Sequence, residues 1–239
     1  MRGEVLYNAS MNVLALDTSM GACSAAILRA EGDALRLHAR QEAMARGHAE
    51  ALMPMVAELL AEAGLAASEL DLIAATMGPG SFTGVRIAIA AARGLALATR
   101  AKLYGTDSLS VMARVARNSG TSPDGPFAVA VDARRGMLYL GLYDETGARR
   151  DGPLLIAPDE AGRLLPADLG TAVGSGASLL ADASALQGRR IETALPELQP
   201  SAAALAEIAL EAGETRRTLR PLYLRPPDAR PQAPGVLRR

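Results

Sequence analysis

The sequence is poor in cysteine, histidine and aromatic residues. A single cysteine, Cys23, excludes an intrachain disulfide and a zinc ribbon, and its place in an apolar run indicates a small buried residue rather than a nucleophile. The two histidines, His38 and His48, lack the spacing that places a metal-binding pair on one helical face. We therefore expect no metal site, no histidine-pair peptidase chemistry and structural roles for both histidines.

Neither sign of charge dominates, because 25 lysines and arginines face 26 aspartates and glutamates. Such a chain lacks the broad basic field that drives non-specific nucleic-acid binding, so any RNA contact must be local. The tail is the one basic region, through Arg216, Arg217, Arg220, Arg225, Arg230, Arg238 and Arg239. These arginines predict either contacts to RNA phosphates or a solvated end, while residues 222–224 are expected to pack on the body.

Long hydrophobic runs are also scarce, because charge or glycine interrupts the apolar segments. We therefore expect no segment long enough to cross a bilayer. Residues 1–10 lack the basic start and the cleavage site of a secretory signal, and we interpret them as an extension before the fold. The protein is expected to be cytoplasmic.

The chain contains a pattern that occurs twice. An apolar run ending in Asp17, a polar turn and a second apolar run predict a β-hairpin, and the same order returns around Asp132. Alternating helices and strands follow each hairpin, and the first half is predicted as βββαβαβα. This repeat is typical of the duplicated actin-like or sugar-kinase-like α/β fold, also called the ASKHA or ribonuclease H-like fold. We expect one lobe over residues 11–118, a smaller one over 119–225 and a basic tail over 226–239.

A glycine-rich turn at residues 78–84 lies between a predicted strand and a predicted helix. No Lys-Ser or Lys-Thr follows it, so it is not a phosphate-binding P-loop. Two interpretations stay open: a structural junction that shapes an interface, or a direct nucleotide contact. The candidates for a degenerate nucleotide or anion site are Asp17, Ser19, Gly80, Ser81, Thr83, Gly84, Arg86 and Asp132.

The two hairpin turns favour a degraded site over a working one. In actin-like ATPases the equivalent acids help to place a metal-bound nucleotide, and a glycine usually follows two residues later so that the backbone approaches phosphate. Here Ser19 and Arg134 occupy those positions. A role for Asp17 and Asp132 as simple caps of their hairpins remains equally open.

The predicted helix at residues 85–99 is apolar on more than one face, because Arg86, Arg93 and Thr99 are its polar residues. The predicted helix at 49–63 is similarly apolar. The surplus indicates either contact with a partner or cover by the chain itself. The candidates for a partner interface are Met53, Val56, Leu60, Ile87, Ala90, Ala91, Gly94 and Ala98.

Five stretches of the chain resemble the bacterial TsaB (YeaZ) family, whose members assist the synthesis of threonylcarbamoyladenosine in tRNA. In chain order they are residues 11–19, Cys23-Ser24, residues 78–86, residues 131–134 and residues 221–225. The resemblance runs from residue 11 to about residue 225 and stops at the basic tail.

The resemblance implies a non-catalytic scaffold that binds and activates a TsaD-like catalytic subunit, which modifies adenosine 37 of tRNAs reading ANN codons. It further implies a TsaE-like ATPase as third component, a homodimer when the chain is alone, and tRNA contacted indirectly or through the tail. No cofactor is required by the chain itself, although ATP or ADP at the partner interface stays open. The alternative is a self-sufficient enzyme of the same fold, either a small-molecule kinase or an M22-type peptidase.

Overall fold

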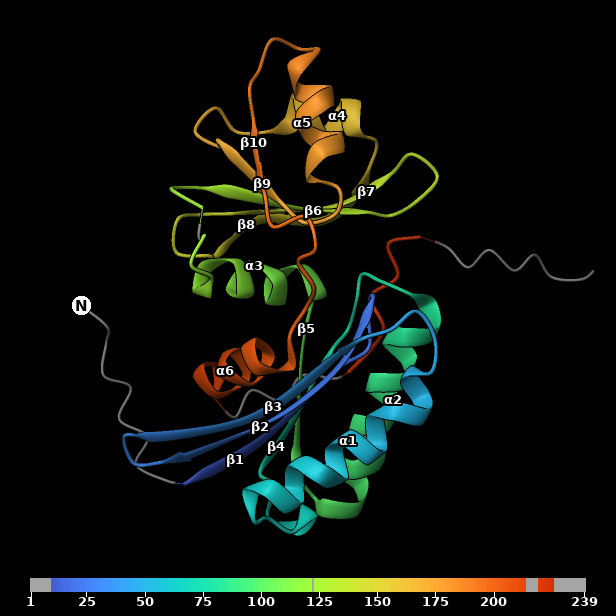
Figure 1. Cartoon of the computed structure of the whole chain (residues 1–239), viewed down its shortest axis with the longest axis vertical. Coiled ribbons are helices and arrows are strands. Elements are labelled where there is room, and N and C mark those ends of the chain that lie inside the picture. Colours follow the sequence, from blue (N-terminus) through green and yellow to red (C-terminus); the bar gives the residue numbers. More distant parts are fainter. Residues whose placement is uncertain (1–9, 122, 214–218, 226–239) are drawn as a thin grey trace, which may run out of the picture.

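Two five-stranded mixed sheets of the same topology form the framework of the computed structural model, which describes residues 10–121, 123–213 and 219–225 (Figure 1). The first has the order β3-β2-β1-β4-β5, from strands β1 (Met11–Asp17), β2 (Ala22–Glu31), β3 (Ala34–Ala43), β4 (Leu72–Thr76) and β5 (Lys102–Thr106). The second has the order β8-β7-β6-β9-β10, from β6 (Phe127–Asp132), β7 (Leu138–Tyr143), β8 (Arg149–Ile156), β9 (Thr171–Val173) and β10 (Glu192–Ala194). The equal orders confirm the duplicated actin-like α/β fold.

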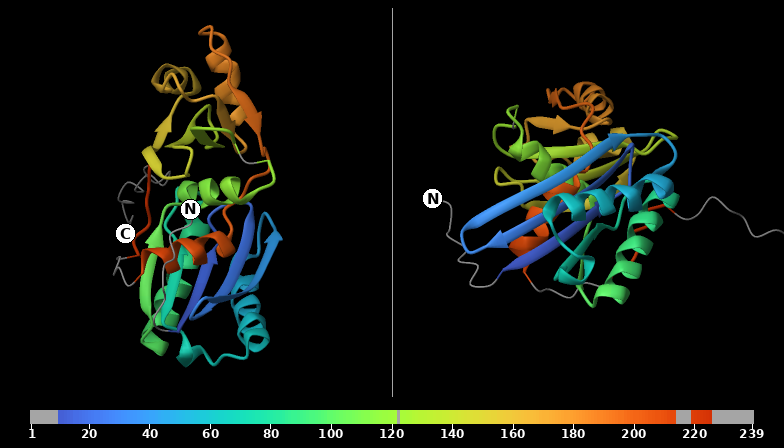
Figure 2. Two further views of the ribbon diagram at one scale, coloured as in Figure 1. Left: turned by 90° about the vertical axis from the view of Figure 1, so that its left-hand side faces the viewer. Right: turned by 60° about the horizontal axis from the view of Figure 1, so that its bottom comes forward.

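Helices cover both sheets and separate them (Figures 1 and 2). Helices α1 (His48–Ala63) and α2 (Phe82–Thr99) pack on the outer face of the first sheet, next to a short 3₁₀ turn, η1 (Ala67–Glu69). Helices α4 (Pro158–Leu164) and α5 (Ala177–Ala185) cover the far face of the second sheet. Helices α3 (Ser108–Asn118) and α6 (Ala202–Ala212) lie between the two sheets.

The helix ends follow from local sequence. Asp107 caps α3, because its carboxylate accepts a hydrogen bond from the Ser110 backbone N–H at 2.9 Å. Gly64 ends α1 in the left-handed conformation, as expected of a glycine after a helix. Ser81 caps α2 by accepting from the Gly84 backbone N–H, so this helix begins at Phe82 and includes part of the predicted turn.

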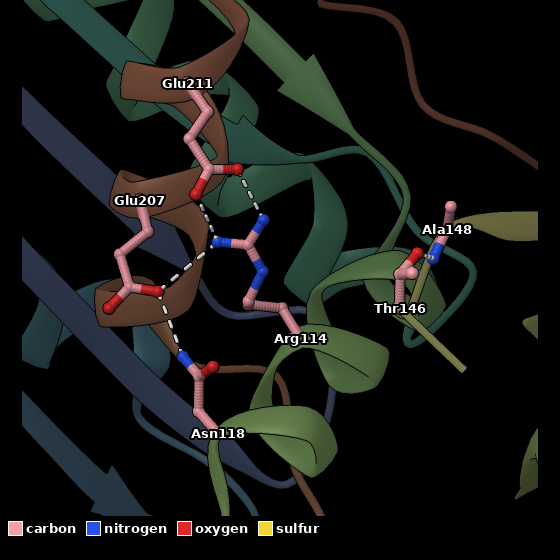
Figure 3. A network of polar contacts seen from close by, with 6 residues as sticks. All are labelled: Arg114, Asn118, Thr146, Ala148, Glu207 and Glu211. Atoms are coloured by element: carbon pink, nitrogen blue, oxygen red, sulfur yellow. Dashed lines mark hydrogen bonds and ion pairs between the residues drawn. The ribbon is translucent and has the colours of Figure 1, made fainter. Parts of the chain in front are cut away.

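The two inner helices exchange lobes. Helix α3 follows the first sheet in the chain but buries Leu109, Met112 and Ala116 against the second sheet, whereas α6 follows the second sheet and packs against the first. Thus α3, from the lobe expected over residues 11–118, packs on the second sheet, and α6, from the lobe expected over 119–225, packs on the first. Side-chain contacts join the two helices, because the Arg114 guanidinium donates to Glu211 at 2.8 and 2.5 Å (Figure 3).

One expectation about membranes was wrong. Among the described residues, α2 is long and apolar enough by length and composition to cross a bilayer. In the fold it lies along the first sheet, where Val85, Ala88, Ile89 and Ala92 are buried. Only 28% of this helix is buried, so packing on the first sheet uses one face of α2 and leaves apolar residues outside it.

Candidate functional site

The first hairpin turn is closed around a buried carboxylate. Asp17 is 0% exposed, and its Oδ1 accepts hydrogen bonds from the Thr76 hydroxyl and from the Ser19 hydroxyl at 2.7 Å. Ser108 extends the network by donating its hydroxyl to Ser19 Oγ at 2.9 Å. Burial raises the pKa of the Asp17 carboxyl, and the bonds from Thr76 and Ser19 offset part of that rise. Solvent does not reach Asp17, and its Oδ2 has no hydrogen-bond partner among the described residues.

The glycine-rich turn packs directly on this hairpin turn. A Cβ on Gly80 would lie 2.2 Å from the Ser19 carbonyl oxygen, and one on Gly84 would lie 2.0 Å from the Thr18 carbonyl oxygen. The Ser81 backbone N–H donates to Ser19 O at 2.7 Å. Both glycines are therefore explained by contact between backbones, without any ligand. Of the two interpretations of the turn, these contacts support the structural junction.

The other candidates from this stretch have separate surroundings. Thr83 is exposed, and the helix is capped by Ser81 instead. The Arg86 guanidinium lies over the Phe82 ring at 3.6 Å, and its Nε donates to the Tyr223 hydroxyl at 2.7 Å. Phe82 and Tyr223 stack with ring centroids 5.1 Å apart. Arg86 thus belongs to a cluster with the C-terminal segment, which the residue pattern did not predict.

That C-terminal segment bridges the two lobes. Leu219 is buried in the core of the first lobe, and the Leu222 backbone N–H donates to Met77 O at 2.7 Å. At its far end the Arg225 guanidinium donates to Ala133 O at 3.1 Å, in the second lobe. The expectation that Leu222 and its neighbours return to the body is confirmed. Arg216, Arg217, Arg230, Arg238 and Arg239 lie outside the described residues.

The second hairpin turn is open. Asp132 is partly buried and accepts from the Arg134 backbone N–H at 2.7 Å, whereas the Arg134 side chain is 86% exposed. Both residues line a cleft of about 940 Å³ between the lobes. Ser19, Gly80 and Ser81 line the opposite wall of this cleft, together with Phe82. The structure thus brings part of the candidate site together while Asp17 and Gly84 stay beneath the surface.

A second candidate surface lies on α1 and α2, which run side by side on the outside of the first lobe (Figure 1). Seven of the candidates are wholly or partly accessible there and are named the docking face: Met53, Leu60, Ile87, Ala90, Ala91, Gly94 and Ala98. Val56 is 1% exposed and belongs to the core, so it is not available to a partner. Leu97, which the sequence reasoning missed, is 87% exposed on α2.

The remaining candidates for metal or nucleophile chemistry are histidine, cysteine and carboxylate side chains. Among the described residues, no three histidine, cysteine or carboxylate side chains are grouped so that they could hold a metal ion. Cys23 is buried, and burial, followed by the charges of Asp17 and Glu42, raises the pKa of its thiol to about 11. The thiolate form that would act as a nucleophile is therefore disfavoured.

Known proteins similar to this chain have names from threonylcarbamoyladenosine synthesis. A family model described as "TsaD: tRNA N6-adenosine threonylcarbamoyltransferase" matches residues 40–198. The tRNA threonylcarbamoyladenosine biosynthesis protein TsaB of Escherichia coli is 38% identical over 140 residues, which are 57% of this chain and 58% of that protein. This alignment therefore spans less than two thirds of the E. coli relative.

Two other relatives match over nearly their whole length. An uncharacterised protein of Mycobacterium tuberculosis is 35% identical over 223 residues, covering 92% of this chain and 95% of that protein. The structure of YeaZ from Pseudomonas aeruginosa superposes with a TM-score of 0.74 at 34% identity and covers 90% of this chain and 100% of that one.

Proposed function

This chain belongs to the TsaB (YeaZ) family, and from that premise we propose that it is a non-catalytic subunit that binds and activates a TsaD-like catalytic subunit. The reaction it supports is threonylcarbamoylation of adenosine 37 in tRNAs reading ANN codons, in the cytoplasm. A TsaE-like ATPase is the third component. The role of this chain's TsaB homologues in threonylcarbamoyladenosine biosynthesis supports the pathway. The docking face supports the mode of action.

The observation that carries the proposal is that the outward surface of α2 is apolar and exposed. Ala90, Gly94 and Ala98 are exposed and small, and no atom outside the helix lies within 4 Å of a Cβ built on Gly94. Leu97 is 87% exposed beside them, and Met53 of the neighbouring α1 is 43% exposed. Small residues allow another helix to approach closely, and large apolar side chains beside them gain from being covered.

The chemistry of the first lobe also supports a non-catalytic role. The acid that would help to place a metal-bound nucleotide, Asp17, is 0% exposed and bonded to Thr76 and Ser19. Ser19 O and Gly80 lie in contact where a phosphate would need backbone space. The alternative, a kinase or an M22-type peptidase, requires turnover by the purified chain alone. The scaffold requires activity that rises only when the TsaD-like subunit is added.

Two substitutions of Gly94 test the docking face. Gly94→Arg places a long charged side chain on the exposed surface of α2, and we expect it to weaken association with the TsaD-like subunit by about 2 kcal/mol or more. Gly94→Ala is the matched control, because its methyl group meets no atom of this chain and gives the position the same small side chain as its neighbours Ala90 and Ala98. Ala91→Arg is less clean, since Ala91 also packs against the core.

Isothermal titration of the purified TsaD-like subunit into each variant measures the effect. Equal affinity of wild type and a folded Gly94→Arg variant would show that this face does not dock the partner. We also expect the isolated chain to form a homodimer through the same face, which Gly94→Arg should convert to a monomer in sedimentation velocity experiments. A wild-type monomer at high concentration would contradict the homodimer.

A further inference from the structure

The mouth of the cleft between the lobes is unusually aromatic for this chain. The sequence contains two phenylalanines, five tyrosines and no tryptophan. Three of these seven rings, Phe82, Tyr139 and Tyr223, line the cleft. Phe82 is 43% exposed and Tyr223 is 42% exposed, although stacked rings in a small protein are normally covered. Arg86 holds the pair in place through its contact with both rings.

Two arginines of the second hairpin turn line the same cleft as these rings. Arg134 and Arg135 both have positive φ angles, 63° and 55°, ahead of Gly136 at 70°. Such turns favour asparagine and glycine, and arginine in the left-handed region is strained. The strain indicates that these positions serve their side chains rather than the turn. Asp132 is the one acidic residue among the described residues of the cleft wall, against Arg134, Arg135 and Arg225. Asp132 pairs with Arg134 at 3.4 Å, and Arg225 donates to Ala133 O, so the wall keeps a net positive charge with Arg134 86% exposed.

The lining of the cleft suits an unpaired RNA nucleotide better than a free nucleoside triphosphate. A free nucleoside triphosphate needs a backbone cradle, and that space is filled where Gly80 contacts Ser19 O. Stacked aromatic rings beside arginines are what unpaired bases and their phosphates require. At about 940 Å³ the cleft is at the upper end of the range of small-ligand sites, roughly 300–1,000 Å³.

We propose that the mouth of the cleft binds an unpaired nucleotide of an RNA loop, with the base stacked on the Phe82–Tyr223 pair and a neighbouring phosphate held by Arg134. This site lies between the lobes and uses no residue of the docking face. It is therefore independent of the docking proposal: either can be wrong while the other holds.

The test is fluorescence anisotropy of the full chain with a labelled RNA hairpin that carries an unpaired loop. We expect the hairpin to bind more tightly than a fully paired RNA duplex. Arg134→Ala and Phe82→Leu should each weaken binding by about tenfold, and Arg134→Ala should lower the salt slope by about 0.7. Arg163→Ala, an exposed arginine on α4 away from the cleft, is the matched control and should bind as wild type.

Three results would overturn the proposal. One is equal binding by wild type, Arg134→Ala and Phe82→Leu; another is equal affinity for hairpin and duplex. The third is displacement of the hairpin by ATP bound to the isolated chain, which would make the cleft a site for free nucleotide. The Arg134 side chain is 86% exposed, so its variant remains informative if Phe82→Leu disturbs α2. Gly94→Arg should bind the hairpin normally, which separates this test from the docking test.

Discussion

The two hairpin turns occupy equivalent places in the two lobes but have opposite surroundings. In the first, Asp17 and Ser19 are 0% exposed, whereas in the second the equivalent side chains of Asp132 and Arg134 are 30% and 86% exposed. Each turn is nevertheless supported by a glycine turn behind it: Gly80 contacts Ser19 O, and a Cβ on Gly174 would lie 2.5 Å from Ala130 O. The glycine turns therefore serve the fold in both lobes. Both hairpin turns reach the cleft, and the second presents the more exposed side chain, that of Arg134.

The largest expected effect comes from filling the contact in the first lobe. Gly84→Ala places a Cβ 2.0 Å from the Thr18 carbonyl oxygen, which is backbone and cannot move aside cheaply. We expect it to destabilise the protein by about 3 kcal/mol or more, measured by urea unfolding.

Gly94→Ala on the same helix is the control for that substitution. Its Cβ meets open space, and the gain in helix propensity should stabilise the protein by about 0.5–1 kcal/mol. A Gly84→Ala variant as stable as wild type would mean that the first turn is not packed as described.

Asp17→Asn should reveal the buried carboxylate through the pH dependence of stability. Because the pKa of Asp17 is raised in the fold, the unfolded chain releases this proton at lower pH than the folded chain. The ionised group therefore costs stability as pH rises above about 4, the ordinary carboxyl pKa. Relative to wild type, Asp17→Asn should gain stability between pH 4 and neutrality in urea unfolding.

A difference that stays flat over that pH range would contradict the buried, destabilising charge. A constant offset at all pH values is expected from the amide itself and does not affect the test. Asp132→Asn in the open turn should change the free energy of unfolding by less than about 0.5 kcal/mol at neutral pH, because water reaches this side chain.

A smaller effect is expected from Gly136, a glycine of the second hairpin turn itself. Gly136 has φ 70°, but no atom lies within 4 Å of a Cβ built on it. Gly136→Ala should therefore cost only the strain of the left-handed region, about 1 kcal/mol in urea unfolding. A loss as large as that of Gly84→Ala would show that both turns are equally closed.

The smallest expected effect is on the reaction rate of the Cys23 thiol. With its pKa raised to about 11, the buried Cys23 thiol should react very slowly with an aromatic disulfide reagent at pH 8 in the folded protein. Gly84→Ala should speed labelling, because opening of the first lobe becomes more frequent. Rapid labelling of the wild type would contradict a closed first lobe.

The sequence predicted those features that depend on local pattern. The hairpins around Asp17 and Asp132 were recognisable because each is two apolar runs about a polar turn, and this repeat identified the fold. Strand β10 was missed because Glu192–Ala194 has no apolar run. The exchange of α3 and α6 between lobes depends on packing over long distances along the chain, which periodicity does not encode.

The candidate site was predicted less completely than the fold. Residues 78–84 were identified as a shaped turn, but only the structure shows that Gly80 and Gly84 contact backbone. Val56 was assigned to the surface because α1 has more apolar residues than one face holds, and pattern alone does not rank its faces. The Phe82–Tyr223 pair joins residues from opposite ends of the chain, so no local signal could reveal it.

The most direct test of the central claim is the threonylcarbamoyladenosine content of tRNA after depletion of this chain, measured by mass spectrometry of digested nucleosides. We predict that the content falls and that wild type and Gly94→Ala restore it, whereas Gly94→Arg, produced at equal level, does not. Unchanged content after depletion would contradict a role in this modification. Full restoration by Gly94→Arg would contradict docking through α2.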